Sequence, residues 1–101
     1  MANTLKKLFR GAATTTTTTV LYTVPASTTT VVTNIVVTNS AASAATFTIT
    51  LDSVDLFKDA AIAANTTALF DLKQVLATTK IIAGLASAIT VKFQISGVEI
   101  V

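Results

Sequence analysis

Stretches suited to β-strands dominate the segment from residue 20 to residue 52, and this segment constrains the fold more than any other part of the chain. Its first strand, Val20–Val24, is short and apolar. Pro25 follows directly, and because its ring fixes φ and holds the preceding residue extended, the strand ends there. The next stretch, Thr28–Asn39, consists largely of Thr and Val, whose branched Cβ atoms fit a pleated sheet better than a helix. The segment therefore predicts strands.

Two stretches, Thr46–Asp52 and Ala88–Ser96, alternate strictly between apolar and polar residues, as strands with one buried face do. Beyond the second, the apolar positions change from odd to even numbers at Gly97, which predicts a β-bulge or a sharp bend. The residues expected to face inward are Phe47, Ile49 and Leu51 in the first stretch, Ile89, Val91, Phe93 and Ile95 in the second, and then Val98 and Ile100.

The strand 28–39 carries apolar residues at both odd and even positions, so both of its faces are expected to be at least partly buried. We expect Val31, Ile35 and Val37 on one face, and Val32 and Val36 on the other.

The whole chain predicts about eight strands, with turn signals roughly 8 to 12 residues apart. In a chain of 101 residues, this spacing is typical of one antiparallel two-sheet sandwich, either a jelly roll or an immunoglobulin-like fold. Two segments interrupt the strand pattern. Asp59–Asn65 is ambiguous between a short helix and a loop, of which we favour the loop, and Asp71–Leu76 predicts one helical turn.

Residues 1–19 are expected to form an extended N-terminal arm, and residues 20–101 the sandwich domain. The arm ends in a run of Thr, Thr14–Thr19, which holds a helix poorly. We expect the arm to cross onto a neighbouring subunit. Alternatively, the Thr run pairs as an extra edge strand of the protein's own sheet.

Charge is scarce in this chain: charged residues make up 12% of it, about half the usual share, and none occurs from Gly11 to Leu51. Soluble sandwiches usually guard their sheet edges with Lys or other charges, so unguarded strands favour a protein covered by neighbouring subunits. The alternative is that Thr and Asn side chains alone keep the protein in solution. We predict assembly contacts at the arm residues Leu5, Lys6, Lys7, Leu8, Phe9 and Arg10, and at the outward side chains of Thr33 and Thr48. A charge placed at either Thr should disturb assembly more than folding.

The residue types of the chain exclude several chemistries. Without His or Cys it cannot perform nucleophile–imidazole catalysis or build the usual zinc and iron sites. Asp52, Asp55 and Asp59 lack the spacing of a calcium loop and are expected to cap turns. We therefore expect a non-enzymatic protein with no catalytic residues, no metal site and no cofactor.

Binding sites for nucleic acid or carbohydrate also have weak support. Lys6, Lys7 and Arg10 form a basic patch without the aromatic ladder of a single-strand binder, so we do not expect nucleic acid as a partner. Tyr22 is the one candidate ring for stacking on a sugar; the alternative places it at the edge of the core with its hydroxyl in water. No apolar run has the length of a signal peptide core or a membrane span, so we expect no membrane contact.

Four segments, taken in their order, resemble a group of small all-β bacteriophage virion proteins. They are LYTVPASTTTVVTNIVVTN, SAASAATFTITL, IAANTTALFDLKQVL and AITVKFQISGVEI, and they cover most of the chain from Leu21 to Ile100. The resemblance implies a structural subunit of a phage particle and carries over no catalytic residues.

On these grounds we expect a capsid decoration or cement protein that stabilises the particle through subunit contacts. It would be located in the virion and assembled in the host cytoplasm. The alternatives are a tail, neck or baseplate accessory protein and a host-surface or glycan-binding tip module. The expected partners are major capsid or tail proteins and further copies of the chain, in a trimer for example.

Overall fold

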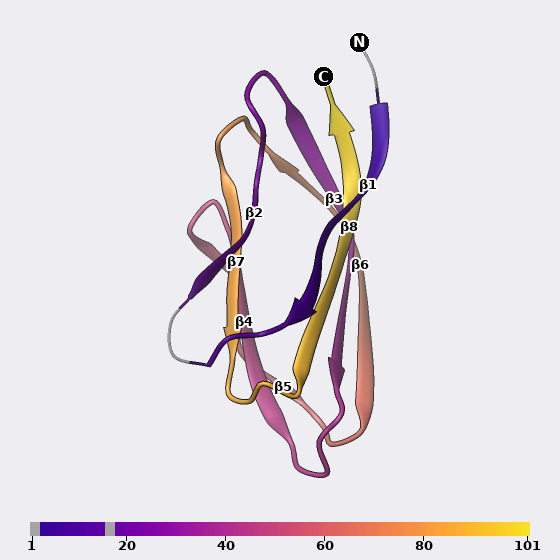
Figure 1. Ribbon diagram of the computed structural model, residues 1–101, viewed down its shortest axis with the longest axis vertical. Helices are drawn as coiled ribbons and strands as arrows, with labels where there is room; N and C mark the ends of the chain where they lie inside the picture. The colour runs from indigo at the N-terminus through magenta and orange to yellow at the C-terminus, as the bar shows by residue number, and fades with distance from the viewer. Residues whose placement is uncertain (1–2, 16–17) are drawn as a thin grey trace.

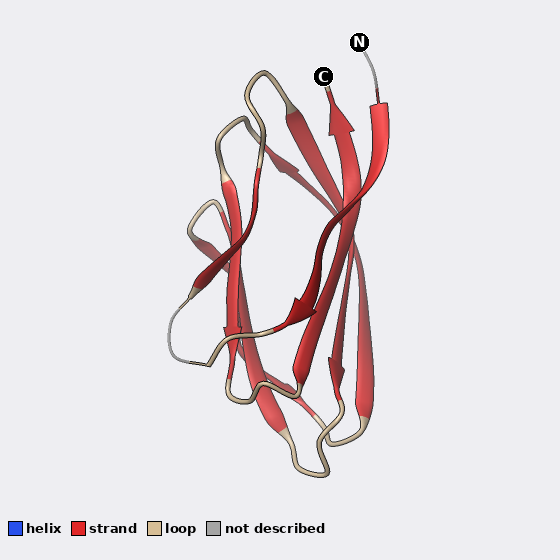
Figure 2. Cartoon of the chain, in the orientation of Figure 1, coloured by secondary structure: helices blue, strands red, loops and turns tan. Residues whose placement is uncertain are grey.

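The computed structural model describes residues 3–15 and 18–101, and within them the chain forms eight β-strands and no helix (Figure 2). The predicted all-β fold is therefore confirmed. The strands are β1 (Asn3–Ala12), β2 (Thr19–Thr23), β3 (Thr29–Asn39), β4 (Ala45–Leu51), β5 (Val54–Ile62), β6 (Thr66–Leu76), β7 (Ile81–Ala86) and β8 (Val91–Ile100).

The strands form two four-stranded antiparallel sheets that pack face to face as a sandwich (Figure 1). Sheet A has the strand order β1-β8-β3-β6, and sheet B has the order β2-β7-β4-β5. The first strand thus pairs with the eighth, the second with the seventh, the third with the sixth and the fourth with the fifth. One long hairpin rolled up on itself has this pairing, so of the two expected sandwich types the strand order selects the jelly roll.

The core between the sheets is centred on Phe47 of β4. Its ring centroid lies 5.5 Å from that of Phe57, 6.2 Å from that of Phe70 and 6.2 Å from that of Phe93. These rings belong to β5, β6 and β8, so Phe47 joins both sheets. Most of the other fully buried large side chains are aliphatic, and two, Asn39 and Thr30, are polar; the aliphatic ones are Ile35, Ile49, Ile82, Ile95, Val24, Val32, Val37 and Val91.

A line of bulges crosses sheet A. The register shifts at Leu8 in β1, at Thr33 in β3 and at residues 72–73 in β6, and all three shifts lie level with Ser96 and Gly97 of β8. An extra residue in one strand sends the following side chains to the opposite face. β1 and β3 therefore change the parity of their inward residues part of the way along. The inward residues of β6 stay at even numbers on both sides of its register shift: Ala68, Phe70, Leu72 and Leu76.

Because of the bulge at Thr33, the faces of β3 differ from those predicted for the long strand 28–39. Val32, Ile35 and Val37 are all completely buried in the core, although their numbers differ in parity. Val31 lies on the outer face of sheet A, so its predicted grouping with Ile35 and Val37 is wrong.

The predicted change of phase in β8 is also wrong. The inward set continues without interruption through Gly97 and Glu99, while Val98 and Ile100 lie on the outer face, half-buried. The extra residues belong to the neighbouring strands, and β8 runs between them without one.

Two segments expected to leave the strand pattern are mostly strand. Residues 59–62 complete β5, and only residues 63–65 connect it to β6. Within this part of β5, Asp59 has a positive φ of 48°. Residues 71–76 complete β6 and make no helical turn. Their helix-like apolar spacing has another origin, because this part of β6 is apolar on both faces: Leu72 and Leu76 point inward and Val75 points outward.

The expected N-terminal arm is part of the sandwich over residues 3–12. These residues form β1, which pairs with β8 along its length and makes one edge of sheet A. Beyond β1 the chain crosses from sheet A to sheet B, where the amide of Ala86 donates to the carbonyl oxygen of Thr14 at 2.9 Å. The last residue of the Thr run, Thr19, lies in β2, which is an edge strand of sheet B. Residues 16–17 of the run lie outside the described part of the chain.

Candidate functional site

The outer face of sheet A carries a row of four apolar side chains, one from each strand, which we call the apolar row. Leu5 of β1 stands opposite Val98 of β8, which stands opposite Val31 of β3, which in turn stands opposite Val75 of β6. Directly opposed residues in an antiparallel sheet share a face, so the four side chains form a continuous band. Leu5 is 85% exposed and Val75 68% exposed, so both ends of the row are open to solvent.

A polar row lies beside the apolar row, one step along the strands. It runs from Lys7 on β1 through Ser96 and Asn34 to Asp71 on β6. The row therefore has a cation at one edge of the sheet and an anion at the other. Neither Lys7 nor Asp71 forms an ion pair with any other residue in the described part of the chain.

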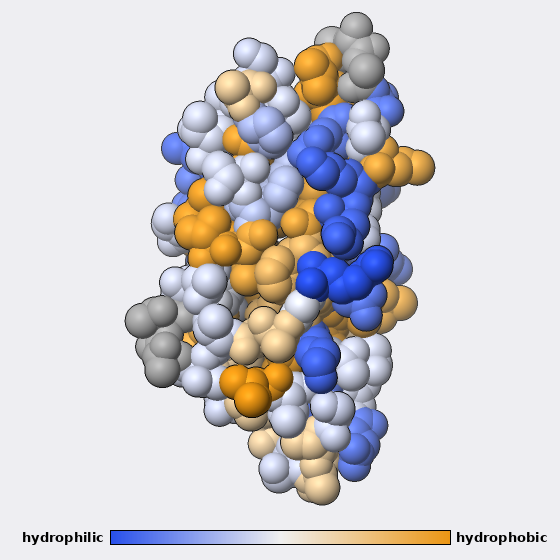
Figure 3. Space-filling view, viewed as in Figure 1, coloured by the Kyte–Doolittle hydropathy of each residue, from blue (hydrophilic) through white to orange (hydrophobic). Residues whose placement is uncertain are grey.

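The third row contains Arg10, Gln94, Val36 and Leu69, in the same strand order. Figure 3 shows strongly polar surface bordered by apolar surface on the side of the molecule where β1 and β8 lie. Apolar and charged groups thus alternate on one flat, four-stranded face, a composition that suits a protein contact better than a substrate pocket.

A hollow of about 470 Å³ opens at the bulges of β3 and β6. It is lined by Thr33, Asp71, Leu72 and Lys73. The extra residue at this point spreads the two strands locally, which is a common effect of a bulge at a sheet edge. The hollow extends the outer face of sheet A toward the β6 edge.

The structure divides the eight predicted contact residues into two groups. Leu5, Lys7 and Arg10 are exposed on the outer face of sheet A, beside the rows just described. Thr33 is half-buried at the bulge, where its hydroxyl donates to the carbonyl oxygen of Ser96 at 3.2 Å. These four residues share one region of the surface.

Of the other four predicted residues, Lys6, Leu8 and Phe9 lie on the inner face of sheet A, and Thr48 is covered on the outer face of sheet B. Leu8 is buried in the core, Phe9 packs against it, and Lys6 points inward toward Glu99. Thr48 was expected to point outward, but it is only 5% exposed, and its hydroxyl accepts a hydrogen bond from the amide of Asp59 at 3.0 Å. Thr48 is therefore not an exposed residue, and a charge there is expected to disturb folding as well.

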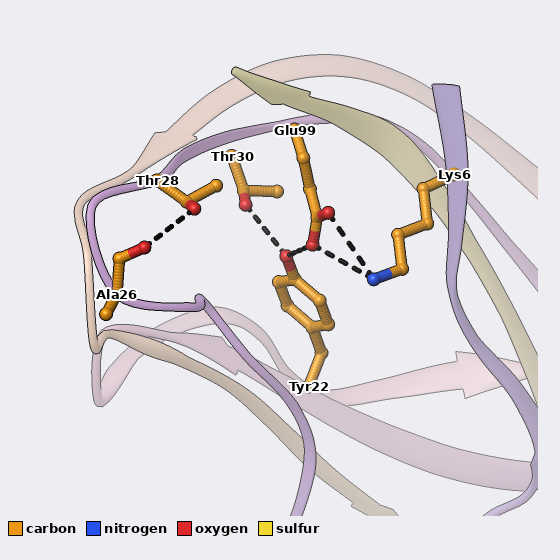
Figure 4. Close-up of polar contacts among 6 residues, drawn as sticks. All are labelled: Lys6, Tyr22, Ala26, Thr28, Thr30 and Glu99. Atoms are coloured by element: carbon orange, nitrogen blue, oxygen red, sulfur yellow. Dashed lines mark hydrogen bonds and ion pairs between the residues drawn. The ribbon is translucent and has the colours of Figure 1, made fainter. Parts of the chain in front are cut away.

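A buried polar cluster lies between the sheets near the C-terminal end of β8 (Figure 4). Tyr22 of β2 donates a hydrogen bond of 2.5 Å to the carboxylate of Glu99 and lies 2.8 Å from the hydroxyl of Thr30. Lys6 of β1 pairs with the same carboxylate at 3.2 Å. Four strands thus meet in one hydrogen-bonded group, which lets a carboxylate lie inside the sandwich because its charge is paired.

The environment of the cluster shifts the pKa of both acids. Burial, together with the hydrogen bond to Glu99, raises the pKa of Tyr22 to about 12. The pKa of Glu99 is lowered, first because its carboxylate accepts the hydrogen bond from Tyr22; burial opposes this effect, and the hydrogen bond and charge of Lys6 add to it. The pair is therefore a neutral phenol and an ionised carboxylate at neutral pH.

We predict that Tyr22 ionises far above the usual range for tyrosine. Its pKa is higher in the folded protein than in the unfolded chain, so its contribution to stability is complete below pH 10 and is lost as the pH rises from 10 to about 12. The chain has one Tyr and no Trp, so an ultraviolet titration of the phenolate reports this residue alone. The midpoint should lie near 12 or coincide with alkaline unfolding, and it should return to about 10 in denaturant.

The variant Glu99→Gln serves as the comparison for this titration. It keeps Tyr22 buried but removes the adjacent charge, so the phenolate midpoint should fall toward 10 without reaching it. A midpoint near 10 in the folded wild-type protein would mean that the hydroxyl lies in water, as the sequence alone allowed, and would contradict the cluster.

The sequence contains one signal for this cluster. Glu99 occupies an inward, odd-numbered position of an alternating strand, and a lone acid at such a position requires a buried partner. Its partners could not be identified from the sequence because they lie in β1 and β2, at the other end of the chain.

Comparison with known proteins finds no matching family model, no similar curated protein and no similar solved structure. The described residues contain no group of three or more His, Cys, Asp or Glu side chains placed to hold a metal ion. Within the same residues there is also no helix with the length and apolar character needed to cross a membrane.

Proposed function

We propose that the protein is a structural subunit of a bacteriophage particle, where it acts as a capsid decoration or cement protein. The observation that carries this proposal is the outer face of sheet A, where an exposed apolar row crosses all four strands beside charged residues. Soluble monomers rarely expose large continuous apolar surface, and such surface usually marks a contact with another protein.

Three further observations support a role in assembly. The jelly roll is an architecture that viral capsid proteins share with lectins and cupins, although fold alone does not define function. The sequence resemblance from Leu21 to Ile100 concerns virion proteins in particular. Exposed large apolar residues also occur away from sheet A, which suits a subunit with several neighbours: Val20 in β2, Val54 in β5 and Ile89 in the turn before β8.

The aromatic residues argue against the glycan-binding alternative. All of them lie in the described part of the chain, and none is exposed: Tyr22, Phe47 and Phe93 are buried, while Phe9, Phe57 and Phe70 pack against the core. A sugar therefore finds no exposed ring to stack on. A tail, neck or baseplate position remains the main alternative, because it requires the same kind of contact surface.

Electron microscopy of purified phage particles that contain this chain tests the proposal. We expect jelly-roll density of this size at repeated positions on the capsid lattice, with the copy number set by the shell. Density confined to the tail or neck would favour the accessory role. Particles that band in a gradient free of the chain, as judged by mass spectrometry, would contradict any virion role.

A further inference from the structure

We infer that the outer face of sheet A is a two-fold symmetric contact between two copies of this chain. The axis runs parallel to the strands and lies between β8 and β3, the two central strands of the sheet. Rotation about this axis places β1 of one copy over β6 of the other and β8 over β3. Closed pairs of this isologous kind are the commonest form of oligomer in soluble proteins.

The apolar row is complementary to itself under this rotation. The rotation leaves each row at the same level along the strands and reverses the order of the four strands. Leu5 therefore meets Val75 of the second copy, and Val98 meets Val31. The two most exposed side chains of the row, Leu5 and Val75, thereby cover each other. The contact removes from water the apolar surface that the monomer leaves exposed.

The charges of the polar row match under the same rotation. Lys7 faces Asp71 of the second copy, and by symmetry Asp71 faces Lys7, which gives two ion pairs. Each pair lies about 7 Å from the axis, because neighbouring strands are about 4.8 Å apart. In the third row, Arg10 lies over Leu69 of the second copy and next to Asp71 of that copy. Lys92 is at the start of β8, where its side chain can reach solvent.

The charges also exclude the other two-fold arrangement of these faces. An axis perpendicular to the strands, level with the polar row, would place Lys7 over Lys7 and Asp71 over Asp71. Like charges facing each other across an interface weaken binding, so of these two arrangements the side chains favour the axis parallel to the strands.

The face has the area that a specific dimer needs. Four strands about 4.8 Å apart and about ten residues long cover about 600 Å², so two faces together bury about 1,200 Å². This value lies at the low end of specific interfaces, and we expect a dissociation constant in the micromolar range. The strands of the two stacked sheets thus run in nearly the same direction, within the range of about 30° that aligned sheet packing allows.

This contact does not depend on the virion role, since it concerns the purified protein alone. Sedimentation equilibrium of the full chain should show a monomer–dimer equilibrium. Val75→Asp should make the protein monomeric. Ile89→Asp is the matched control, because Ile89 is equally exposed at 68% but lies in the turn before β8, and it should leave the dimer unchanged.

A charge exchange tests the orientation. Lys7→Asp and Asp71→Lys should each weaken the dimer by about tenfold or more, because each replaces two ion pairs with two like-charge pairs. The double variant, which carries both substitutions, should restore it. An equimolar mixture of the two single variants should form heterodimers, since each position 7 then faces an opposite charge at position 71.

Thermal unfolding of each variant separates loss of the contact from loss of the fold, and all four altered positions are exposed. Wild-type protein that stays monomeric at its highest soluble concentration would overturn the inference. So would a trimer, or a dimer that keeps its affinity in Val75→Asp. Failure of both the double variant and the mixture to dimerise would overturn the proposed orientation and with it the two-fold contact.

Discussion

Gly97→Ala should destabilise the protein by about 3 kcal/mol or more, a large share of the stability of a domain of this size. A Cβ at position 97 would lie 2.3 Å from the carbonyl oxygen of Val31 and 3.0 Å from Cδ1 of Leu8. The first contact is with backbone, which cannot move aside without breaking the pairing of β3 with β8. Steric conflict, rather than conformational strain, is the cause, because Gly97 does not have a positive φ.

The chain offers a matched series for this prediction. At Gly84 a Cβ would lie 2.9 Å from the carbonyl oxygen of Thr48, whereas at Gly11 the nearest atom is a ring carbon of Phe9 at 3.3 Å. Gly84→Ala should therefore cost less than Gly97→Ala. Gly11→Ala should be neutral or slightly stabilising, by up to about 1 kcal/mol, because alanine reduces the freedom of the unfolded chain. Urea unfolding of the three variants measures the order, and equal losses at positions 97 and 11 would contradict it.

Asn39→Asp should also cost about 3 kcal/mol or more at neutral pH, although the two side chains have nearly the same shape. Asn39 is fully buried. Its Nδ2 donates to the carbonyl oxygens of Ser43 at 2.9 Å, Ala63 at 3.4 Å and Ile62 at 3.5 Å. Its Oδ1 accepts from the amide of Ala41 at 3.1 Å and from the hydroxyl of Thr90 at 3.1 Å.

This side chain holds together the three connections at one end of the sandwich, between β3 and β4, β5 and β6, and β7 and β8 (Figure 1). A carboxylate at position 39 would turn an oxygen toward the carbonyl groups that Nδ2 now serves, and would place a charge in the interior. The loss should shrink in acid, where a protonated carboxyl group can donate one hydrogen bond.

Chemical unfolding at neutral and acidic pH measures this effect, with Asn65→Asp as control. Asn65 is exposed, and its φ of 52° is one that Asp also tolerates, so this variant should lie within about 0.5 kcal/mol of the wild type. A loss at position 39 that is no larger than the loss at position 65 would contradict the role of Asn39.

Several features of the fold follow from local sequence. The alternation in 46–52 and 91–96, the end of β2 before Pro25 and the all-β class could all be predicted, because period-two patterning and proline geometry act on a few neighbouring residues. Ile89 was predicted to face inward, which is wrong: it lies in the turn before β8 and is 68% exposed. On the candidate surface, Leu5, Lys7 and Arg10 were identified as contact residues from their composition, and they do lie on the exposed face of sheet A.

The error in the faces of β3 arises from the bulge at Thr33, whereas the error in residues 71–76 has another origin. In residues 71–76, Leu72, Val75 and Leu76 have the spacing of a helical face, yet Leu72 and Leu76 point into the sandwich and Val75 points out. Simple alternation places Leu72 and Leu76 on one face and Val75 on the other, so a strand that is apolar on both faces can have the same spacing as a helical face.

What the sequence determined by itself is therefore local: which segments are strands, where turns occur and that the protein lacks the residues for common catalytic and metal sites. What only the tertiary structure decided is which strands become neighbours and which of two apolar faces is the core. Val98 and Ile100 were expected inside and Glu99 outside, but the reverse holds. The reason is that Tyr22 and Lys6, brought beside β8 by the roll of the chain, supply the partners that allow a carboxylate to be buried.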